Sequence, residues 1–265
     1  MAEGDRVPPL AGEDVEVIRA PVLEGLRHGF LGRRGGASTG EVAGLNVGLG
    51  AGDDPVLVAE NRRRAAAAVA PGARLVTVYQ VHSADCATVC EPPWPETDRP
   101  HVDALVTDRP GLVLGIVTAD CAPVLLADRE AGVVGAAHAG WKGAIGGVTD
   151  ATLAAMERLG ARPSRIVAAV GPCIAQSSYE VDAAFRDRFL AAAPANLAFF
   201  AAGREGHWQF DLEGYVAARL QAAGVAAVER LGLDTYAAPG RFFSFRRATH
   251  RAQASYGRQI SLIAP

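Results

Sequence analysis

Three apolar runs follow one another between Gly111 and His138, and they constrain the fold more than any other part of the sequence. The runs read GLVLGIVTADC, PVLLAD and GVVGAAH, and the polar turn 129–131 joins the second to the third. Nearly unbroken apolar runs of this length are typical of strands buried inside a sheet. The first run stops at Ala-Asp-Cys and the third stops at a histidine, and neither ending helps a strand to pack. We therefore expect buried strands whose ends form part of a site.

The rest of the chain mixes helices and strands without a regular βαβ alternation. Helices are predicted at residues 52–71, 142–160, 180–193 and 211–224, and further strands at 74–82, 165–173 and 259–264. This mixture favours an α+β fold, a single domain with mixed β-sheets flanked by helices, over a doubly wound sheet. The domain is expected to cover residues 1–265, with the acidic, proline-rich residues 1–20 as a loosely ordered N-terminal extension.

Composition excludes several classes of protein. Hydrophobic residues make up 49% of the chain, which is enough for a sizeable core, and the net charge of −3 comes without a basic block. We therefore expect neither a nucleic-acid partner nor a membrane partner. Four cysteines do not make a disulfide scaffold, and neither a signal peptide nor an apolar run of about 20 residues is recognisable. A cytoplasmic location is the expectation.

Three predicted strand ends present metal-ligand side chains: His82 in QVHS, Cys121 in TADC and His138 in HAGW. Cys121 and His138 are separated by two predicted strands and a turn, a return path that can bring them together. Three protein ligands and one open position are typical of catalytic zinc, and the open position would hold a water of lowered pKa. The same atoms also fit a Cys121 nucleophile with His138 as its general base, and each residue alone fits simple packing.

The remaining cysteines and histidines are weaker candidates. Cys86 and Cys90 lie four apart on a probable strand, where core packing is the better interpretation. Cys173 in GPC either lines the same pocket or fills a tight turn. The other histidines have no local pattern that marks them as ligands; they are His28, His101, His207 and His250.

A glycine-rich loop, HGFLGRRGGASTG, runs from His28 to Gly40. Its backbone N–H groups, arginines and hydroxyls can cradle an anion such as phosphate, although an ordinary turn gives the same pattern. It contains neither a Walker loop nor a dinucleotide fingerprint. Arg246 and Arg247 either add anion affinity or form a solvated basic surface.

The order of several motifs resembles that of the laccase-domain family. The shared motifs are HGFLGRRGGAS, LNVGLGAGDDP followed by NR, QVHS, DALVTD, TADCAPV, HAGWKG, GPCI and FSFRR, and they span the chain from about His28 to its end. Members were first labelled multicopper polyphenol oxidases. They were later described as zinc-dependent purine nucleoside phosphorylases with adenosine deaminase activity, and as peptidoglycan editing factors.

The resemblance implies a function, a cofactor and a set of residues. The family's metal ligands fall on His82, Cys121 and His138, which would hold one Zn²⁺ per chain, with copper as the alternative. Its fold is a single α+β domain that is remotely similar to a bacterial toxin with a catalytic Cys-His pair. The implied small-molecule partners are phosphate and a nucleoside, namely adenosine, inosine or methylthioadenosine. Hydrolytic deamination of adenosine is the second implied reaction.

Roles for further residues follow from this chemistry. With Cys121 and His138, Asp120 is a candidate catalytic residue, either as the acid that protonates leaving ammonia or as the group that fixes the turn. The candidates for binding substrate or phosphate are Arg33, Ser38, Arg62 and Arg258, and Arg62 is equally consistent with a solvated helix position. A multicopper oxidase is excluded, because six histidines, three of them already used, cannot build a trinuclear cluster.

Two departures from the family pattern and two rival functions stay open. Leu31-Gly32 stands where the family often has Ser-Thr, and Tyr256-Gly257-Arg258 stands where it often has Thr-Gly-Arg. Lost hydroxyls there would change affinity if they contact phosphate or ribose. The rival functions are a cysteine hydrolase or amidase that edits peptidoglycan precursors, and a non-catalytic partner in envelope assembly.

Overall fold

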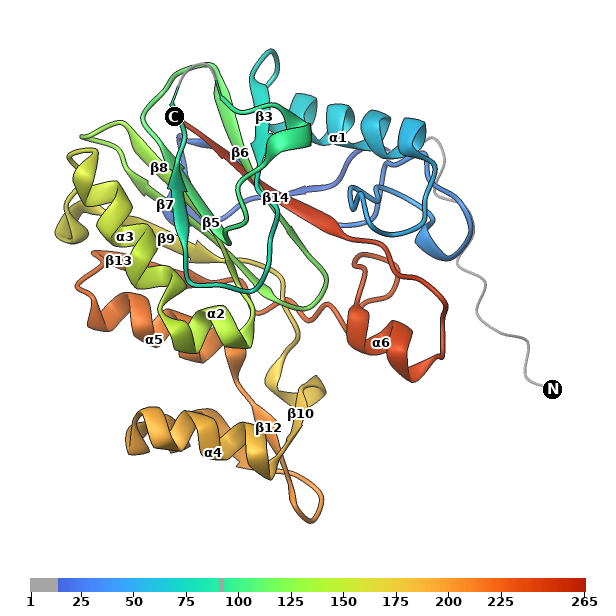
Figure 1. The fold of residues 1–265 in the computed structure, drawn as a ribbon, viewed down its shortest axis with the longest axis vertical. Coiled ribbons are helices and arrows are strands. Elements are labelled where there is room, and N and C mark those ends of the chain that lie inside the picture. The colour runs from blue at the N-terminus through green and yellow to red at the C-terminus, as the bar shows by residue number, and fades with distance from the viewer. Residues whose placement is uncertain (1–13, 91–92) are drawn as a thin grey trace.

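The computed structural model describes residues 14–90 and 93–265, which form four layers (Figure 1). Two large sheets lie face to face and enclose one apolar cluster between them. Helix α1 (Pro55–Val69) covers the outer face of the five-stranded sheet. Helices α2 (Trp141–Gly146), α3 (Val148–Arg158) and α5 (Leu212–Ala222) cover the outer face of the six-stranded sheet. Among the described residues, no helix is long and apolar enough to cross a membrane.

The five-stranded sheet contains both ends of the described chain. Its order is β1 (Val17–Ile18), β2 (Arg27–Leu31), β14 (Gln259–Ala264), β6 (Leu112–Thr118) and β3 (Arg74–Thr77). All neighbours are antiparallel except β3 and β6, which are parallel.

The six-stranded sheet is also mixed. Its order is β13 (Ala227–Arg230), β9 (Val167–Val170), β7 (Ala122–Asp128), β8 (Val133–Ala139), β5 (Ala104–Thr107) and β4 (Cys86–Thr88). The outer pairs, β13 with β9 and β4 with β5, are parallel, and the inner pairs are antiparallel. Two mixed sheets flanked by helices confirm the predicted α+β class.

The four layers explain the apolar runs. In β6, Leu114 and Ile116 face the space between the sheets, whereas Val113 and Val117 face α1. In β7, Val124 faces the helices and Leu125 faces the other sheet. Strands buried on both faces have no solvated side to alternate with, so their sequences are continuously apolar.

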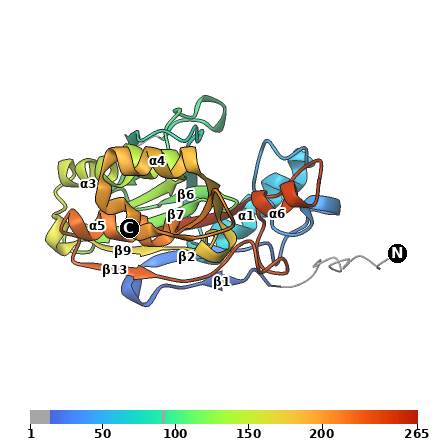
Figure 2. The same ribbon diagram turned by 90° about the horizontal axis from the view of Figure 1, so that it is seen from below.

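A small sheet and two further helices lie outside these layers. The sheet has the order β10 (Glu180–Asp182), β12 (His207–Phe210) and β11 (Phe200–Ala202), and α4 (Ala183–Ala192) packs on it. This unit projects from one side of the body (Figure 1). Helix α6 (Phe245–His250) lies at the end of the molecule opposite α3 (Figure 2).

Several predicted boundaries were wrong, each for a reason that the structure shows. The helix predicted at 142–160 is two helices, because Gly147 has a φ of 95° and ends α2. The segment predicted as a helix at 180–193 begins as β10, and α4 starts only where Asp182 accepts a hydrogen bond from the Phe185 N–H. The strand predicted at 74–82 ends at Thr77, after which Gln80 hydrogen-bonds through its side chain to both backbone groups of Val117.

The N-terminal prediction is partly outside the described residues. Of the extension expected at residues 1–20, residues 1–13 lie outside them. Val17 and Ile18 form β1 and pair with Phe30 and Leu31, so an ordered strand begins earlier than predicted.

Candidate metal centre

The ends of β6 and β8 and the loop after β3 bring His82, Cys121 and His138 together. Their ligand atoms all lie within 4.8 Å of one another, and Cys121 Sγ is 3.9 Å from His82 Nε2. The two imidazole rings meet edge to face, with centroids 4.7 Å apart. Among the described residues this is the one group of three or more histidine, cysteine or carboxylate side chains able to hold a metal ion. The chain runs from Cys121 along β7 and back along β8, as predicted, and this path brings His138 beside Cys121.

Asp103, fully buried just before β5, holds two of the three ligands in place. Its carboxylate lies 2.7 Å from His138 Nδ1 and accepts hydrogen bonds from the N–H groups of Val81, His82 and Ser83. Because Nδ1 faces a carboxylate, Nε2 of His138 is left to face the site. Asp103 therefore orients one ring and the backbone of the loop that presents the other.

Close backbone approach makes room for the three ligands. His82 has a φ of 61°, a conformation that costs energy for a non-glycine residue. A Cβ on Gly140 would lie 2.9 Å from His82 Cδ2 and 3.0 Å from Cys121 Sγ. Glycine at position 140, in HAGW, is therefore required by the ligands rather than by its own backbone, whose φ is −68°.

The electrostatics of the site favour a thiolate. Burial acts to raise the pKa of Cys121, but the charge and hydrogen bonds of His138 and His82 outweigh burial and lower that pKa. Burial acts to lower the pKa of His138, and Cys121 together with Asp103 outweighs it and raises that pKa. A thiolate beside two imidazole nitrogens is a donor set that a divalent metal ion can share.

Asp120 points away from the three ligands. It is buried with a φ of 87°, and its carboxylate accepts hydrogen bonds from Thr235 Oγ1, Ser244 Oγ and the Arg246 N–H. Burial raises the pKa of Asp120, and these three donors oppose that shift. The contacts match the alternative in which Asp120 fixes the turn before Cys121 and ties it to the start of α6.

A cavity of about 460 Å³ opens on one side of the three ligands. Arg62, Arg99 and Arg258 line it, and no carboxylate is among its lining residues. Aromatic side chains complete the wall; they are Tyr79, Phe245 and Tyr256. Thr118 also lines this cavity, and its buried Oγ1 has no hydrogen-bond partner among the described residues. A cationic wall with an unsatisfied hydroxyl is suited to a polar, anionic ligand.

The predicted anion-binding residues divide into two groups. Arg258 lines the cavity, and its one side-chain hydrogen bond goes to Tyr256. Arg62 lines it too, but its guanidinium is buried against Glu96, Thr77 and the Val47 carbonyl, so it is not the solvated helix residue of the alternative interpretation.

The placement of Arg33 and Ser38 differs from the prediction. Neither is among the residues that line the cavities beside the three ligands. The Arg33 guanidinium donates to the carbonyls of Ala43 and Pro239 and lies over the Phe243 ring, and burial lowers its pKa to about 10. The glycine-rich loop is thus fixed by its own arginine.

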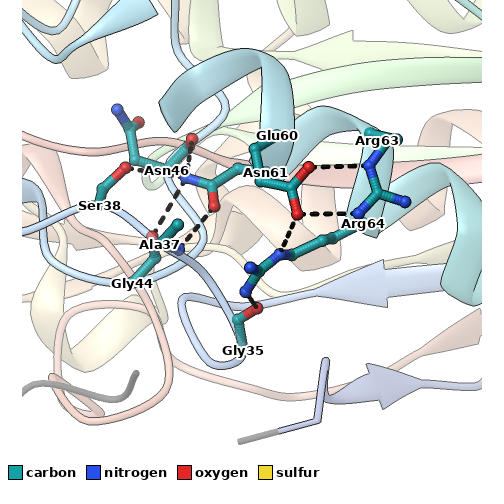
Figure 3. A network of polar contacts seen from close by, with 9 residues as sticks. All are labelled: Gly35, Ala37, Ser38, Gly44, Asn46, Glu60, Asn61, Arg63 and Arg64. Atoms are coloured by element: carbon teal, nitrogen blue, oxygen red, sulfur yellow. Dashed lines mark hydrogen bonds and ion pairs between the residues drawn. The ribbon is translucent and has the colours of Figure 1, made fainter. Parts of the chain in front are cut away.

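Asn61 of α1 holds the rest of this loop (Figure 3). It accepts a hydrogen bond from the Ala37 N–H and donates to Ser38 Oγ and to the carbonyls of Gly44 and Asn46. Ser38 in turn donates to Asp53. Asn46 accepts a hydrogen bond from the Arg258 N–H, so the network also fixes the backbone of a residue that lines the cavity.

The two departures from the family pattern lie in different parts of the structure, and only one of them lines a cavity beside the metal ligands. Leu31 is buried under α1, and a Cβ on Gly32 would lie 2.1 Å from the Arg241 carbonyl oxygen. Neither is among the residues that line the cavities beside the metal ligands. Tyr256, by contrast, lines the arginine-lined cavity and accepts a hydrogen bond from Arg258.

The remaining predicted candidates have structural places. Cys86 lies in β4 against the core, whereas Cys90 lies beyond the end of that strand and is exposed, so the two do not share one strand. Cys173 is buried in the core, and its backbone pairs with that of Asp234 in an isolated parallel β-bridge. Arg247 is buried and donates to the carbonyls of Thr235, Tyr236 and Phe242, which is neither a solvated surface nor a free anion site.

Residues 27–265 match the family model described as multi-copper polyphenol oxidoreductase laccase. The chain belongs to this family. Curated relatives carry a different description: a Deinococcus radiodurans protein named purine nucleoside phosphorylase is 45% identical over 232 residues, 87% of each chain. A Streptomyces griseus protein, also named purine nucleoside phosphorylase, is 42% identical over 86% of this chain and 92% of its own.

Solved structures of family members share the fold. YlmD from Geobacillus stearothermophilus superposes with a TM-score of 0.85 at 32% identity, over 96% of both chains. A Neisseria meningitidis protein of the DUF152 family gives a TM-score of 0.84 at 32% identity, over 95% of this chain and 99% of its own. The family assignment and the α+β fold are therefore confirmed together.

Sequence reasoning missed three residues of the site. Asp103 stands directly before a buried apolar run, DALVTD, where a carboxylate is out of place unless it has partners. Gln80 and Arg99 had no such signal, because the cavity that they line is formed by segments far apart along the chain.

Proposed function

We propose that this protein is a zinc-dependent phosphorylase of purine nucleosides, with adenosine, inosine and methylthioadenosine as its substrates. The observation that supports it is the juxtaposition of the His82, Cys121 and His138 group with a cavity that is lined by three arginines and no carboxylate. Phosphorolysis needs a site for a phosphate anion beside the reacting carbon, and the relatives named purine nucleoside phosphorylase suit the same reaction.

The donor set fits zinc. Zn–N and Zn–S distances of about 2.0 and 2.3 Å in a tetrahedral site place the two ligand atoms roughly 3.6 Å apart. The 3.9 Å between Cys121 Sγ and His82 Nε2 is close to that value. When bound, zinc would supply Lewis-acid activation of a reactant at the position that the protein leaves open.

The chain's own residues would bind and orient the reactants. Arg258 and Arg99 have no carboxylate within ion-pair distance among the described residues, so their charge is available to phosphate. Thr118 Oγ1 offers a hydroxyl to the same ligand. A phosphate oxygen then bonds to C1′ of the ribose while the bond from C1′ to N9 of the purine breaks, and ribose 1-phosphate is released with the free base.

Deamination of adenosine is the second reaction that we propose for this site. Water takes the place of phosphate as the nucleophile, attacks C6 of the purine, and ammonia leaves. The role of Asp120 as the acid remains a prediction. Both of its oxygens accept hydrogen bonds from protein donors, which fits the alternative role of fixing the turn.

The test combines product analysis with metal analysis. Purified protein is incubated with adenosine or inosine, with and without phosphate, and ribose 1-phosphate, free base and inosine are measured. We expect one zinc per chain, with both zinc and turnover lost in His82→Ala and in Cys121→Ala. Cys90→Ala, which changes an exposed thiol outside the site, is the matched control. Turnover by metal-free protein, or the absence of ribose 1-phosphate at high protein concentration, would contradict the proposal.

One observation favours a second candidate, a cysteine hydrolase or amidase. Cys121, His138 and Asp103 are arranged as a nucleophile, a base and an orienting carboxylate. A thiol-selective reagent distinguishes the two. If it abolishes turnover in protein that holds no metal, the hydrolase is supported, whereas protection of Cys121 by bound zinc supports the phosphorylase.

A further inference from the structure

A second cavity, of about 390 Å³, lies on the other side of the metal ligands. It shares His82, Cys121 and Phe245 with the arginine-lined cavity, so the two meet at the candidate metal centre. Its walls are mainly aromatic and aliphatic; they include Trp141, Tyr179, Ile174 and Leu212. Flat apolar walls of this kind suit a planar heterocycle better than they suit phosphate.

One exposed lysine faces this cavity. Lys142 is the single lysine in a chain whose lysine and arginine total is 26. It is exposed, lines the cavity, and its Nζ lies 5.6 Å from the centroid of the Trp141 ring. No carboxylate lies within 4 Å of its ammonium group among the residues of 14–90 and 93–265. Its charge is therefore available to a ligand.

Two other charged groups line this cavity, and both have hydrogen bonds to the protein. Arg246 donates from Nη1 to the Glu180 carbonyl, and its guanidinium lies over the Tyr179 ring at 5.2 Å. Asp120, the carboxylate among the lining residues, accepts three hydrogen bonds from protein donors. Among the described residues, Lys142 is thus the lining cation whose side chain makes neither a hydrogen bond nor an ion pair.

We propose that Lys142 is a catalytic residue that binds the purine and stabilises the negative charge that the base acquires as it leaves. The inference rests on the proposed phosphorolysis. When the C1′–N9 bond breaks, its electron pair stays on the purine, and the charge spreads to N7 and, for inosine, to O6. The Lys142 ammonium donates a hydrogen bond and then a proton to N7, which releases a neutral base, and solvent returns the proton to the amine.

The division of charge between the two cavities supports this orientation. Phosphate, as a dianion, belongs with the three arginines, and the base, which is neutral until it leaves, belongs with the aromatic walls beside Lys142 and Arg246. A cation that meets charge only as the bond breaks binds the transition state more strongly than the substrate, which is the condition for raising kcat.

The test compares two nucleosides that differ in their leaving base. Inosine loses its base as an anion, whereas the base of 7-methylinosine carries a fixed positive charge and leaves without becoming anionic. We expect Lys142→Met to lower kcat/KM for inosine by about 100-fold. The same variant should change kcat/KM for 7-methylinosine by less than about threefold and leave KM for phosphate unchanged. Lys142→Arg, which keeps the charge and the hydrogen bond but does not give up a proton, should recover part of the activity on inosine.

Arg188→Met is the matched control. Arg188 lies at the same 5.6 Å from the Trp141 ring as Lys142, but it is not among the residues that line the cavity. Equal losses on the two nucleosides, or a loss confined to KM for phosphate, would overturn the role of Lys142. If the wild-type protein forms no ribose 1-phosphate from either nucleoside, the proposed function itself fails.

A second readout does not depend on turnover. Because Lys142 is the single lysine, an amine-acylating reagent has one side-chain target, which mass spectrometry can follow. Hypoxanthine should slow acylation of Lys142 several-fold, and inorganic phosphate alone should not. Protection by phosphate without protection by hypoxanthine would put the anion in this cavity and contradict the proposal.

Discussion

Oδ1 of Asp103 lies 2.7 Å from Nδ1 of His138; Asp103 directly precedes β5, and His138 belongs to β8, the antiparallel neighbour of β5. The same carboxylate accepts hydrogen bonds from three successive N–H groups of the loop that carries His82. Burial acts to raise the pKa of Asp103, but His138 and these N–H groups outweigh burial and lower it, so the carboxylate is ionised. One buried charge thus couples two ligands that are far apart in the sequence.

Asp103→Asn should weaken metal binding while leaving the ligands themselves in the chain. An amide offers one acceptor oxygen where the carboxylate offers two, so either the His138 ring or the loop 81–83 loses its partner. Loss of such a supporting group typically lowers metal affinity by about 10–100-fold. Competition with a chelator measures this, and Asp108→Asn, at a half-exposed carboxylate, is the control. Unchanged zinc affinity in Asp103→Asn would show that the carboxylate does not position the ligands.

Gly140→Ala should separate the ligands by steric pressure alone. The added Cβ would come within 3.0 Å of both His82 and Cys121, and the backbone of Gly140 is one that alanine adopts easily. Overpacking of this kind costs about 1–3 kcal/mol, which corresponds to roughly a 10–100-fold loss of zinc affinity. In Gly146→Ala the new Cβ has an ordinary 3.5 Å contact, so that variant should bind zinc normally.

Loss of charge at Arg258 should weaken phosphate binding, whereas loss of charge at Arg33 should lower the stability of the fold. Arg258→Met should raise KM for phosphate by about 10–100-fold, since a hydrogen bond to a charged group contributes about 1.5–3 kcal/mol. Arg33→Met should leave that KM unchanged and lower the free energy of unfolding by about 2–4 kcal/mol, because it leaves two carbonyls without their donor. Phosphate titrations and urea unfolding of both variants test the pair. A raised KM in Arg33→Met with full stability would restore the role first predicted for that residue.

Sequence patterns predicted the features that arise from local rules. The continuous apolar runs indicated strands buried on two faces, and β6, β7 and β8 lie inside the two-sheet sandwich. Strand ends at Cys121 and His138 indicated a site, because a thiol and an imidazole at such places have no packing purpose. The side chains of these residues and His82 do converge.

Features of the site that the sequence did not indicate depend on contacts between distant segments. Arg33 sits in a loop whose composition suits an anion, yet the carbonyls of Ala43 and Pro239 take its donors. Only the fold brings Pro239 to it, 206 residues away. The sequence did not predict the second cavity either, because no local pattern relates the segments that contribute Trp141 and Tyr179 to its wall.

His28 makes the stability of the fold depend on pH. Its Nε2 accepts a hydrogen bond from the Ala20 N–H, and its Nδ1 lies 3.0 Å from the Leu26 carbonyl oxygen, so the folded protein holds the neutral ring. Burial lowers the pKa of His28 below its ordinary 6.5, and the smaller effects of the Leu26 carbonyl and Glu229 do not reverse this. Between the folded and unfolded pKa values, the unfolded chain therefore binds the extra proton.

Stability from His28 is accordingly complete above about pH 6.5 and is lost as the pH falls through the folded pKa. His28→Gln, which cannot be protonated, should lower stability at pH 7.5 by about 1–3 kcal/mol through poorer hydrogen bonds. The difference in unfolding free energy between wild type and His28→Gln should then shrink as the pH is lowered from 7 to 5. Urea unfolding of both proteins across that range measures the difference, with His101→Gln as a control at an exposed ring. A difference that stays constant or grows toward low pH would mean that the folded protein accepts a proton at His28, contrary to the hydrogen bonds at both of its nitrogens.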